Sequence, residues 1–268
     1  MILLYKILNI MIFCIVLTSH LHASYIKIDT NLQTRLESNN LTVLVEVMNN
    51  GDEAAYDIMT NTKISKYSQN SRTQSILKVN ESVEFKFNFE LNIEKSGNYP
   101  VLVRIDYSDM NKYAFSAITL SIITYKDGAY PEVFCKANPL KIVDKGKAHL
   151  IIKNMNEEIK DITAKLIIPK TLSTPNSTQK LTLKPEEEKS IYFNISNFSA
   201  FIGTKAAIFF IVEYDDDEKH FATSVMSHVD IIEKIKLKLY EKIIIVGIPI
   251  LLLISFFIIR FVRKRKIQ

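Results

Sequence analysis

Alternation of apolar and polar residues governs the sequence between about residues 24 and 232. The clearest example is 82–91, where Val83, Phe85, Phe87 and Phe89 alternate with polar residues. A period of two is typical of a β-strand with one face buried and the other in water. We therefore predict a strand at 82–91, with the three phenylalanines on its buried face.

Similar segments recur every 10 to 15 residues, with turn-forming residues between them and no long helical pattern. One predicted strand, 41–47, ends at the turn Asn49-Asn50-Gly51, where asparagine and glycine favour a tight turn and glycine permits positive φ. Two predicted hairpins join 98–107 to 112–124 and 205–214 to 220–232. This pattern indicates an all-β protein built from antiparallel sandwiches.

The outer part of the sequence contains an internal repeat. Residues 44–50 resemble 150–156, residues 78–85 resemble 184–191, and residues 104–109 resemble 211–216. The offset is about 105 residues each time, which is the usual size of one immunoglobulin-like sandwich. We therefore predict two such domains in tandem.

Both ends of the sequence have the composition of membrane-targeting segments. Lys6 precedes an apolar run over 7–17, and small residues follow at Ala23 and Ser24, as in a secretory signal peptide; an uncleaved signal anchor is the alternative. Near the other end, 243–262 is apolar enough and, at about 20 residues, long enough to cross a membrane as a helix. Five basic residues at the end of this segment and directly after it orient the chain with its C-terminus in the cytoplasm: Arg260, Arg263, Lys264, Arg265 and Lys266.

Taken together, these patterns predict a plasma-membrane protein with its N-terminal region outside the cytoplasm. The predicted order is a signal peptide (1–23), a first sandwich (24–124), a linker (125–139), a second sandwich (140–232), a juxtamembrane stalk (233–242), a transmembrane helix (243–262) and a basic cytoplasmic tail (263–268).

Charge agrees with this arrangement. The chain has 34 basic and 29 acidic residues, but six of the basic residues are Lys6 in the signal and the five from Arg260 onward, which leaves 28 against 29 outside the membrane. A nearly neutral exterior argues against nucleic acid as a partner. The expected partners are the lipid bilayer and another envelope or membrane protein.

The turn Asn49-Asn50-Gly51 and the small and apolar residues after it resemble the signature of CARDB-like domains, which are immunoglobulin-like modules of bacterial and archaeal surface proteins. Val79-Asn80-Glu81-Ser82-Val83 and Gly97-Asn98-Tyr99-Pro100-Val101 are similar to the strand opening and the hairpin that follow in such modules. In the second copy Asn156-Glu157-Glu158 lacks the glycine. The resemblance implies a role in adhesion, spacing or assembly on a cell envelope, and it says almost nothing about activity.

Signatures of catalysis are missing. The sequence has no Gly-x-Ser-x-Gly elbow, His-Glu-x-x-His, phosphate loop or dinucleotide fingerprint. His149, His220 and His228 lack the spacing of metal ligands. We therefore predict a non-catalytic protein without a cofactor.

The acidic run Asp215, Asp216, Asp217 and Glu218 is the sharpest polar feature. Ca²⁺ favours several oxygen ligands on a flexible loop, so these four residues are weak candidates for a calcium site. The spacing is not that of an EF-hand, and a solvated hairpin tip is the simpler interpretation.

Three further features have two interpretations each. Cys135 is the only cysteine after signal removal, and it is either buried or free to pair with another chain. Phe198 and Phe201 lie in a predicted loop, where they either form a contact surface or pack on the sandwich end. The Asn-x-Ser/Thr triplets that begin at Asn40, Asn80, Asn176, Asn194 and Asn197 are glycan acceptors only in a eukaryotic secretory pathway.

The sequence therefore predicts a non-catalytic single-pass membrane protein that displays two immunoglobulin-like modules for adhesion, spacing or recruitment of an envelope component. The alternative is an accessory subunit of a membrane complex for export or assembly, similar to the translocon-associated subunits.

Overall fold

A computed structural model describes residues 25–128, 130–216 and 218–234, and over these residues the chain is all-β. The predicted signal peptide, transmembrane helix and basic tail lie outside them, as does most of the predicted stalk. Within the described ranges, no helix is long and apolar enough to cross a membrane.

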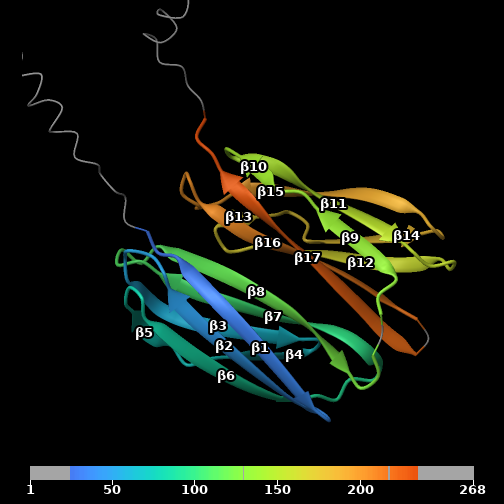
Figure 1. The fold of residues 1–268 in the computed structure, drawn as a ribbon. Coiled ribbons are helices and arrows are strands. Elements are labelled where there is room, and N and C mark those ends of the chain that lie inside the picture. Colours follow the sequence, from blue (N-terminus) through green and yellow to red (C-terminus); the bar gives the residue numbers. More distant parts are fainter. Residues whose placement is uncertain (1–24, 129, 217, 235–268) are drawn as a thin grey trace, which may run out of the picture. The chain divides into compact units, whose positions relative to one another are not determined.

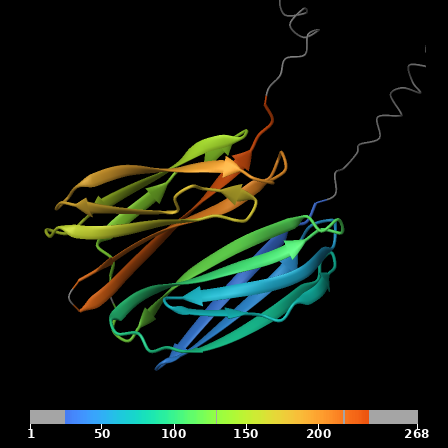
Figure 2. The same cartoon turned by 180° about the vertical axis from the view of Figure 1, so that it is seen from behind.

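The first sandwich has one sheet in the order β1-β2-β6, and its other sheet contains β8, β7 and β3, with β4 and β5 both paired to β3. Figures 1 and 2 show the two layers from opposite sides. The strands are β1 (Ile28–Glu37), β2 (Asn40–Asn49), β3 (Ala55–Ile64), β4 (Tyr67–Asn70), β5 (Gln74–Leu77), β6 (Ser82–Glu90), β7 (Ser96–Ser108) and β8 (Ala114–Tyr125).

The second sandwich repeats this plan. One sheet runs β13-β15-β11-β9, and the other contains β14, β12, β16, β17 and β10. The strands are β9 (Val133–Ala137), β10 (Leu140–Ile142), β11 (Lys145–Asn154), β12 (Lys160–Ile167), β13 (Leu172–Ser173), β14 (Thr178–Leu183), β15 (Glu188–Asn197), β16 (Lys205–Asp215) and β17 (Lys219–Ile231).

The strands predicted from alternation are confirmed. On β6 the side chains of Phe85, Phe87 and Phe89 are buried and their neighbours are exposed. Both predicted hairpins are present as the antiparallel pairs β7–β8 and β16–β17. Each sandwich has its own hydrophobic core, formed by the inward positions of its two sheets, and the two cores share no residue.

The predicted linker, 125–139, is only partly a connection. Its later part forms β9, which pairs antiparallel with β11 and belongs to the second sandwich. Val133 and Cys135 are buried on β9, whereas Phe134 and Lys136 are exposed. The strand has five residues, so its alternation is too short to stand out beside Pro131 and Asn138-Pro139.

The two sandwiches are joined by backbone pairing as well as by the chain. The start of β17 runs parallel to the start of β7, with Lys219 opposite Ser96 and His220 opposite Gly97. Gly97 has a φ of 129°, and a Cβ at this position would lie 1.9 Å from the carbonyl oxygen of His220. A glycine is therefore required at this junction, both for the backbone conformation and for the close approach.

Candidate functional site

The turn motif of the first sandwich is built around a buried asparagine. The side chain of Asn49 is fully buried, and its Nδ2 donates to the carbonyl oxygens of Glu53 at 2.7 Å and Leu77 at 3.1 Å. Its Oδ1 accepts a hydrogen bond from the backbone N–H of Gly51 at 3.0 Å. Buried main-chain groups need such partners, so Asn49 stabilises the fold and is not available to bind a ligand.

Glycine is required at position 51, but the predicted reason, a positive φ, is wrong. Gly51 does not have a positive φ. A Cβ at this position would instead lie 2.3 Å from the carbonyl oxygen of Tyr25 and 2.7 Å from the backbone nitrogen of Lys27. Glycine is needed because the segment before β1 passes directly over the turn, where Asp52 N donates to Tyr25 O at 3.0 Å.

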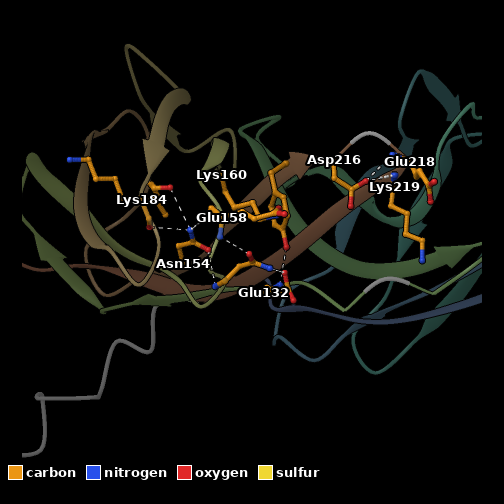
Figure 3. A network of polar contacts seen from close by, with 11 residues as sticks. Glu132, Asn154, Glu158, Lys160, Lys184, Asp216, Glu218 and Lys219 are labelled. Atoms are coloured by element: carbon orange, nitrogen blue, oxygen red, sulfur yellow. Dashed lines mark hydrogen bonds and ion pairs between the residues drawn. The ribbon is translucent and has the colours of Figure 1, made fainter.

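The second sandwich contains the same arrangement around Asn154, which Figure 3 shows. Nδ2 of Asn154 donates to the carbonyl oxygens of Glu158 at 2.7 Å and Lys184 at 3.0 Å. Its Oδ1 accepts from the backbone N–H of Asn156 at 3.1 Å. Asn156 therefore occupies the place of the first copy's glycine, and its side chain reaches the carboxylate of Glu132.

This geometry corrects the first of the three sequence matches by one residue. Asn49 corresponds to Asn154, so the strand residues 44–50 do not align with 150–156 as the sequence suggested. Leu44 is half-buried, whereas Leu150, its predicted counterpart, is fully buried and corresponds to Val45. The second match is confirmed, because Glu81 accepts from Lys78 N at 2.8 Å and Glu187 accepts from Lys184 N at 2.7 Å.

The acidic run forms the tip of the β16–β17 hairpin. Oδ1 of Asp216 accepts hydrogen bonds from the backbone N–H groups of Glu218 at 2.9 Å and Lys219 at 2.6 Å. Oδ1 of Asp215 lies 2.6 Å from Nδ1 of His220. Asp217 lies outside the described residues. In the described ranges no group of three or more His, Cys, Asp or Glu side chains is placed to hold a metal ion.

Asp216 therefore closes its own turn, as Asp109 does at the equivalent hairpin of the first sandwich, where its Oδ1 accepts from Tyr113 N at 2.9 Å. The backbone oxygen of Asp216 also accepts from Nζ of Lys95, across the junction, at 2.6 Å. The hairpin tip thus contacts the first sandwich (Figure 3 shows Asp216, Glu218 and Lys219). These hydrogen bonds explain why the sequence has an aspartate at position 216, and they do not require a bound cation.

His220 is the feature of the junction that sequence reasoning missed. Its imidazole stacks on the ring of Tyr99, with 4.4 Å between centroids and 17° between planes. It also forms ion pairs with Asp215 at 2.6 Å and Glu213 at 3.6 Å, and Glu213 in turn pairs with Lys165. The side chains of His220, Asp215, Glu213 and Lys165 line an open hollow of the second sandwich. Tyr99 is 121 residues away in sequence, so no local pattern could have indicated the contact.

The charges around His220 shift its protonation. Burial lowers the pKa of His220, but the carboxylates of Glu213 and Asp215 outweigh burial and raise it above its ordinary value. Burial acts in the opposite sense on Glu213, yet His220 and Lys165 keep the pKa of that carboxyl below its ordinary value. Burial also raises the pKa of Tyr99 to about 12, with the nearby Asp215 adding to the effect. The cluster therefore favours a charged His220.

An apolar loop (198–204) joins β15 to β16. Phe198, Phe201 and Ile202 in this loop are 76%, 58% and 67% exposed. For Phe198 and Phe201, this exposure favours the predicted contact surface over packing on the sandwich end, although the ring of Phe201 lies 5.9 Å from that of Phe115. Their exposure makes the apolar loop a candidate contact surface.

The remaining sequence candidates have structural roles or none that the contacts reveal. Cys135 is buried, as one of its two interpretations predicted, and burial raises the pKa of its thiol. Asn197 caps the apolar loop, because its Nδ2 donates to Ala200 O at 2.9 Å and its Oδ1 accepts from Ala200 N at 2.8 Å. His149 stacks on Tyr192, and His228 pairs with Asp230 at 3.7 Å. The basic residues Arg260, Arg263, Lys264, Arg265 and Lys266 lie outside the described residues.

Comparison with solved structures gives only distant similarities. A Salmonella alpha-2-macroglobulin mutant and the native conformation of Escherichia coli alpha-2-macroglobulin each have 10% identity and a TM-score of 0.31 over 76% of this chain. Red sea bream transglutaminase has 14% identity and a TM-score of 0.25 over 74% of it. The chain covers 16%, 17% and 31% of those proteins respectively.

A search of curated protein sequences returned no match. The CARDB family model matches residues 24–110, which include the turn around Asn49 and extend into the loop after β7. Residues 24–110 of this chain therefore match the CARDB domain family, whose fold is an immunoglobulin-like β-sandwich.

Proposed function

We propose that this chain is a non-catalytic single-pass membrane protein whose two sandwiches are displayed outside the membrane as one unit, to position or recruit another envelope protein. The apolar segments predicted at 1–23 and 243–262, with the basic residues behind the second, support the membrane orientation.

The backbone pairing between the sandwiches is the observation that carries the proposed role. Two domains on a free linker take many relative positions, whereas here β17 pairs with β7 and the ring of His220 stacks on Tyr99. Lys170 adds an ion pair to Asp106 at 3.0 Å, and its backbone N–H donates to Oγ of Ser116 at 2.7 Å. These contacts favour a unit that holds its exposed surfaces at a set spacing, as a positioning module requires.

The polar candidates of the sequence also favour a structural role. Asn49, Asn154 and Asp216 each direct their side chains to nearby main-chain groups. The side chains of Phe198, Phe201 and Ile202 in the apolar loop, in contrast, are mostly exposed. This distribution, with polar side chains bonded to the main chain and apolar side chains exposed, is most simply explained by a protein that acts by contact with another molecule.

A topology experiment tests the membrane part of the proposal. Protease added to intact cells should digest the region 24–234 and spare a tag placed after residue 268. Removal of residues 241–268 should release a folded exterior into the medium, with a far-UV spectrum dominated by β-structure. Protection of 24–234 from external protease, or a truncated chain that stays in the membrane, would contradict the orientation or the anchor.

A capture experiment tests the recruiting part. Purification in mild detergent should return a stoichiometric protein partner with the wild-type chain. Gly97→Ala should weaken this capture because it breaks the junction, whereas Gly128→Ala, where a Cβ would meet only the methyl group of Thr124 at 3.9 Å, should not. A chain that purifies alone, or one whose partner is indifferent to Gly97→Ala, would refute the positioning role.

A further inference from the structure

The apolar loop is held firmly although its large side chains are exposed. Phe198 N and Ser199 N both donate to Thr171 O at 3.0 Å, and Thr204 N donates to Phe201 O at 3.0 Å. Asn197 bonds both main-chain groups of Ala200, as described above. A loop tied down in this way presents Phe198, Phe201 and Ile202 to the surroundings as a fixed feature. Exposed apolar groups gathered on one loop mark a contact surface.

The apolar loop lies at the end of the second sandwich where the chain leaves it. Gly203 N donates to Ile231 O at 2.8 Å, and Ile231 N donates to Thr204 O at 2.9 Å. The loop is thus bonded directly to the last residue of β17, where the chain leaves the second sandwich. The predicted transmembrane helix begins at residue 243, twelve residues later. Twelve residues reach at most about 40 Å when fully extended.

Because the chain leaves at this end of the sandwich, the proposed anchor at 243–262 restricts this end to within about 40 Å of the bilayer. Three exposed lysines lie on the segments nearest the loop and the exit: Lys145 pairs with Ser196 at the start of β11, Lys205 begins β16, and Lys234 follows β17. Exposed acidic residues, Asp144 and Glu233, stand beside two of them. Aromatic and aliphatic side chains flanked by lysines are the composition that enters the headgroup region of a membrane. A protein partner would not need to lie beside the point where the chain leaves.

The first sandwich extends the same surface. The ring of Phe115, on β8, lies next to Phe201. The hairpin loop before it adds Met110 and Tyr113, whose side chains are largely exposed. The apolar surface therefore continues from one sandwich to the other on the side of the junction near the exit.

We infer that the apolar loop inserts Phe198, Phe201 and Ile202 into the outer surface of the membrane that the chain's own helix crosses. The inference rests on the proposed membrane anchor. The contact adds a second attachment beside the helix, so it restrains the angle at which the two sandwiches leave the bilayer.

Fluorescence of single tryptophans tests this, because the sequence contains no tryptophan. The full-length chain carrying Phe198→Trp is reconstituted into vesicles of phosphatidylcholine and phosphatidylglycerol, with or without a lipid that carries a quencher near its headgroup. Phe134→Trp is the matched control: Phe134 is also exposed, but it lies on β9 opposite Lys153, at the other end of the same sandwich.

The expected result is a blue-shifted emission for Phe198→Trp that the quencher lipid reduces, and an unshifted, unquenched emission for Phe134→Trp. Resistance of the same vesicles to alkaline extraction is measured in parallel. Retained protein with an unquenched Phe198→Trp overturns the contact and leaves the proposed anchor standing. Equal quenching of both variants overturns it too, because the sandwich then lies on the membrane without selecting the loop. Protein lost on alkaline extraction refutes the anchor, and the inference fails with it.

Contact with a protein instead of lipid has its own outcome. In native membranes, Phe198→Trp shielded from iodide while the vesicle experiment shows no quenching would place a protein over the loop. That result also overturns the inference.

Discussion

Replacement of Asn49 by alanine should destabilise the first sandwich more than any change at an exposed asparagine. The carboxamide of Asn49 makes three hydrogen bonds, all to main-chain groups: it donates to Glu53 O and Leu77 O and accepts from Gly51 N. The side chain has no exposed surface. Water therefore cannot replace the lost partners without a local rearrangement.

Each buried polar group left without a partner costs about 1 to 3 kcal/mol. Three such groups, partly relieved by movement of the loop, give an expected loss of about 3 to 5 kcal/mol in the free energy of unfolding. Whole domains are stable by only about 5 to 15 kcal/mol. For a domain of about 100 residues, a loss of this size lowers the melting temperature by roughly 12 to 30 °C.

The measurement is thermal and urea unfolding of the full chain in detergent, followed by circular dichroism. Asn88→Ala is the control, because Asn88 is exposed on the neighbouring β6 and its side chain accepts a surface hydrogen bond from Thr42, whereas its bond from Gln69 is to the backbone oxygen, which alanine keeps. Its expected effect is within about 0.5 kcal/mol. Asn154→Ala, at the equivalent position of the second sandwich, should behave like Asn49→Ala. Equal melting temperatures for Asn49→Ala and Asn88→Ala would refute the reasoning.

Three further predictions concern the junction and the acidic run. The pKa of His220 is raised in the folded chain, so its charged form adds stability that is fully present below the ordinary pKa of about 6.5 and is lost as pH rises through the folded value. The melting temperatures at pH 6 and pH 9 should therefore differ less in His220→Gln than in the wild type. Equal differences in the two proteins would contradict the role of the ion pairs. Gly97→Ala should speed trypsin cleavage at Lys126, between the sandwiches, whereas Gly203→Ala should not, because of these two glycines only Gly97 approaches His220. Identical cleavage rates in the two variants would show that the junction tolerates the methyl group. Asp216→Ala should lower the melting temperature by the same amount with and without Ca²⁺, because Asp216 accepts hydrogen bonds from main-chain N–H groups of its own turn. A decrease that depends on Ca²⁺ would restore the calcium interpretation.

Much of the fold follows from local pattern. Strand β6 and both long hairpins are predictable because burial on one face of a sheet imposes a period of two, and because each hairpin pairs neighbouring segments. The repeat is predictable for the same reason, since two copies of one pattern bury the same positions. The short strand β9 is not, because five residues between prolines carry too little alternation to identify a strand.

The roles of the candidate-site residues could not be predicted from local sequence pattern. The sequence singled out Asn49, Gly51 and the acidic run, but their roles depend on what lies across from them. Gly51 is needed because of the chain before β1, and Asp216 is used by the turn it begins. The correspondence of Asn49 with Asn154 was missed by one residue, and in a strand a shift of one residue moves every side chain to the other face.

The sequence by itself determined that the region 24–232 is all-β, that it is built as two similar sandwiches, and that apolar segments stand at both ends. These properties depend on neighbours in the chain and on the period of burial. Only the tertiary structure decided that β17 pairs with β7, that His220 stacks on Tyr99, and that the apolar loop lies where the chain leaves the second sandwich. Each of these contacts joins residues that are far apart in the sequence, and their energies depend on distances that no local pattern specifies.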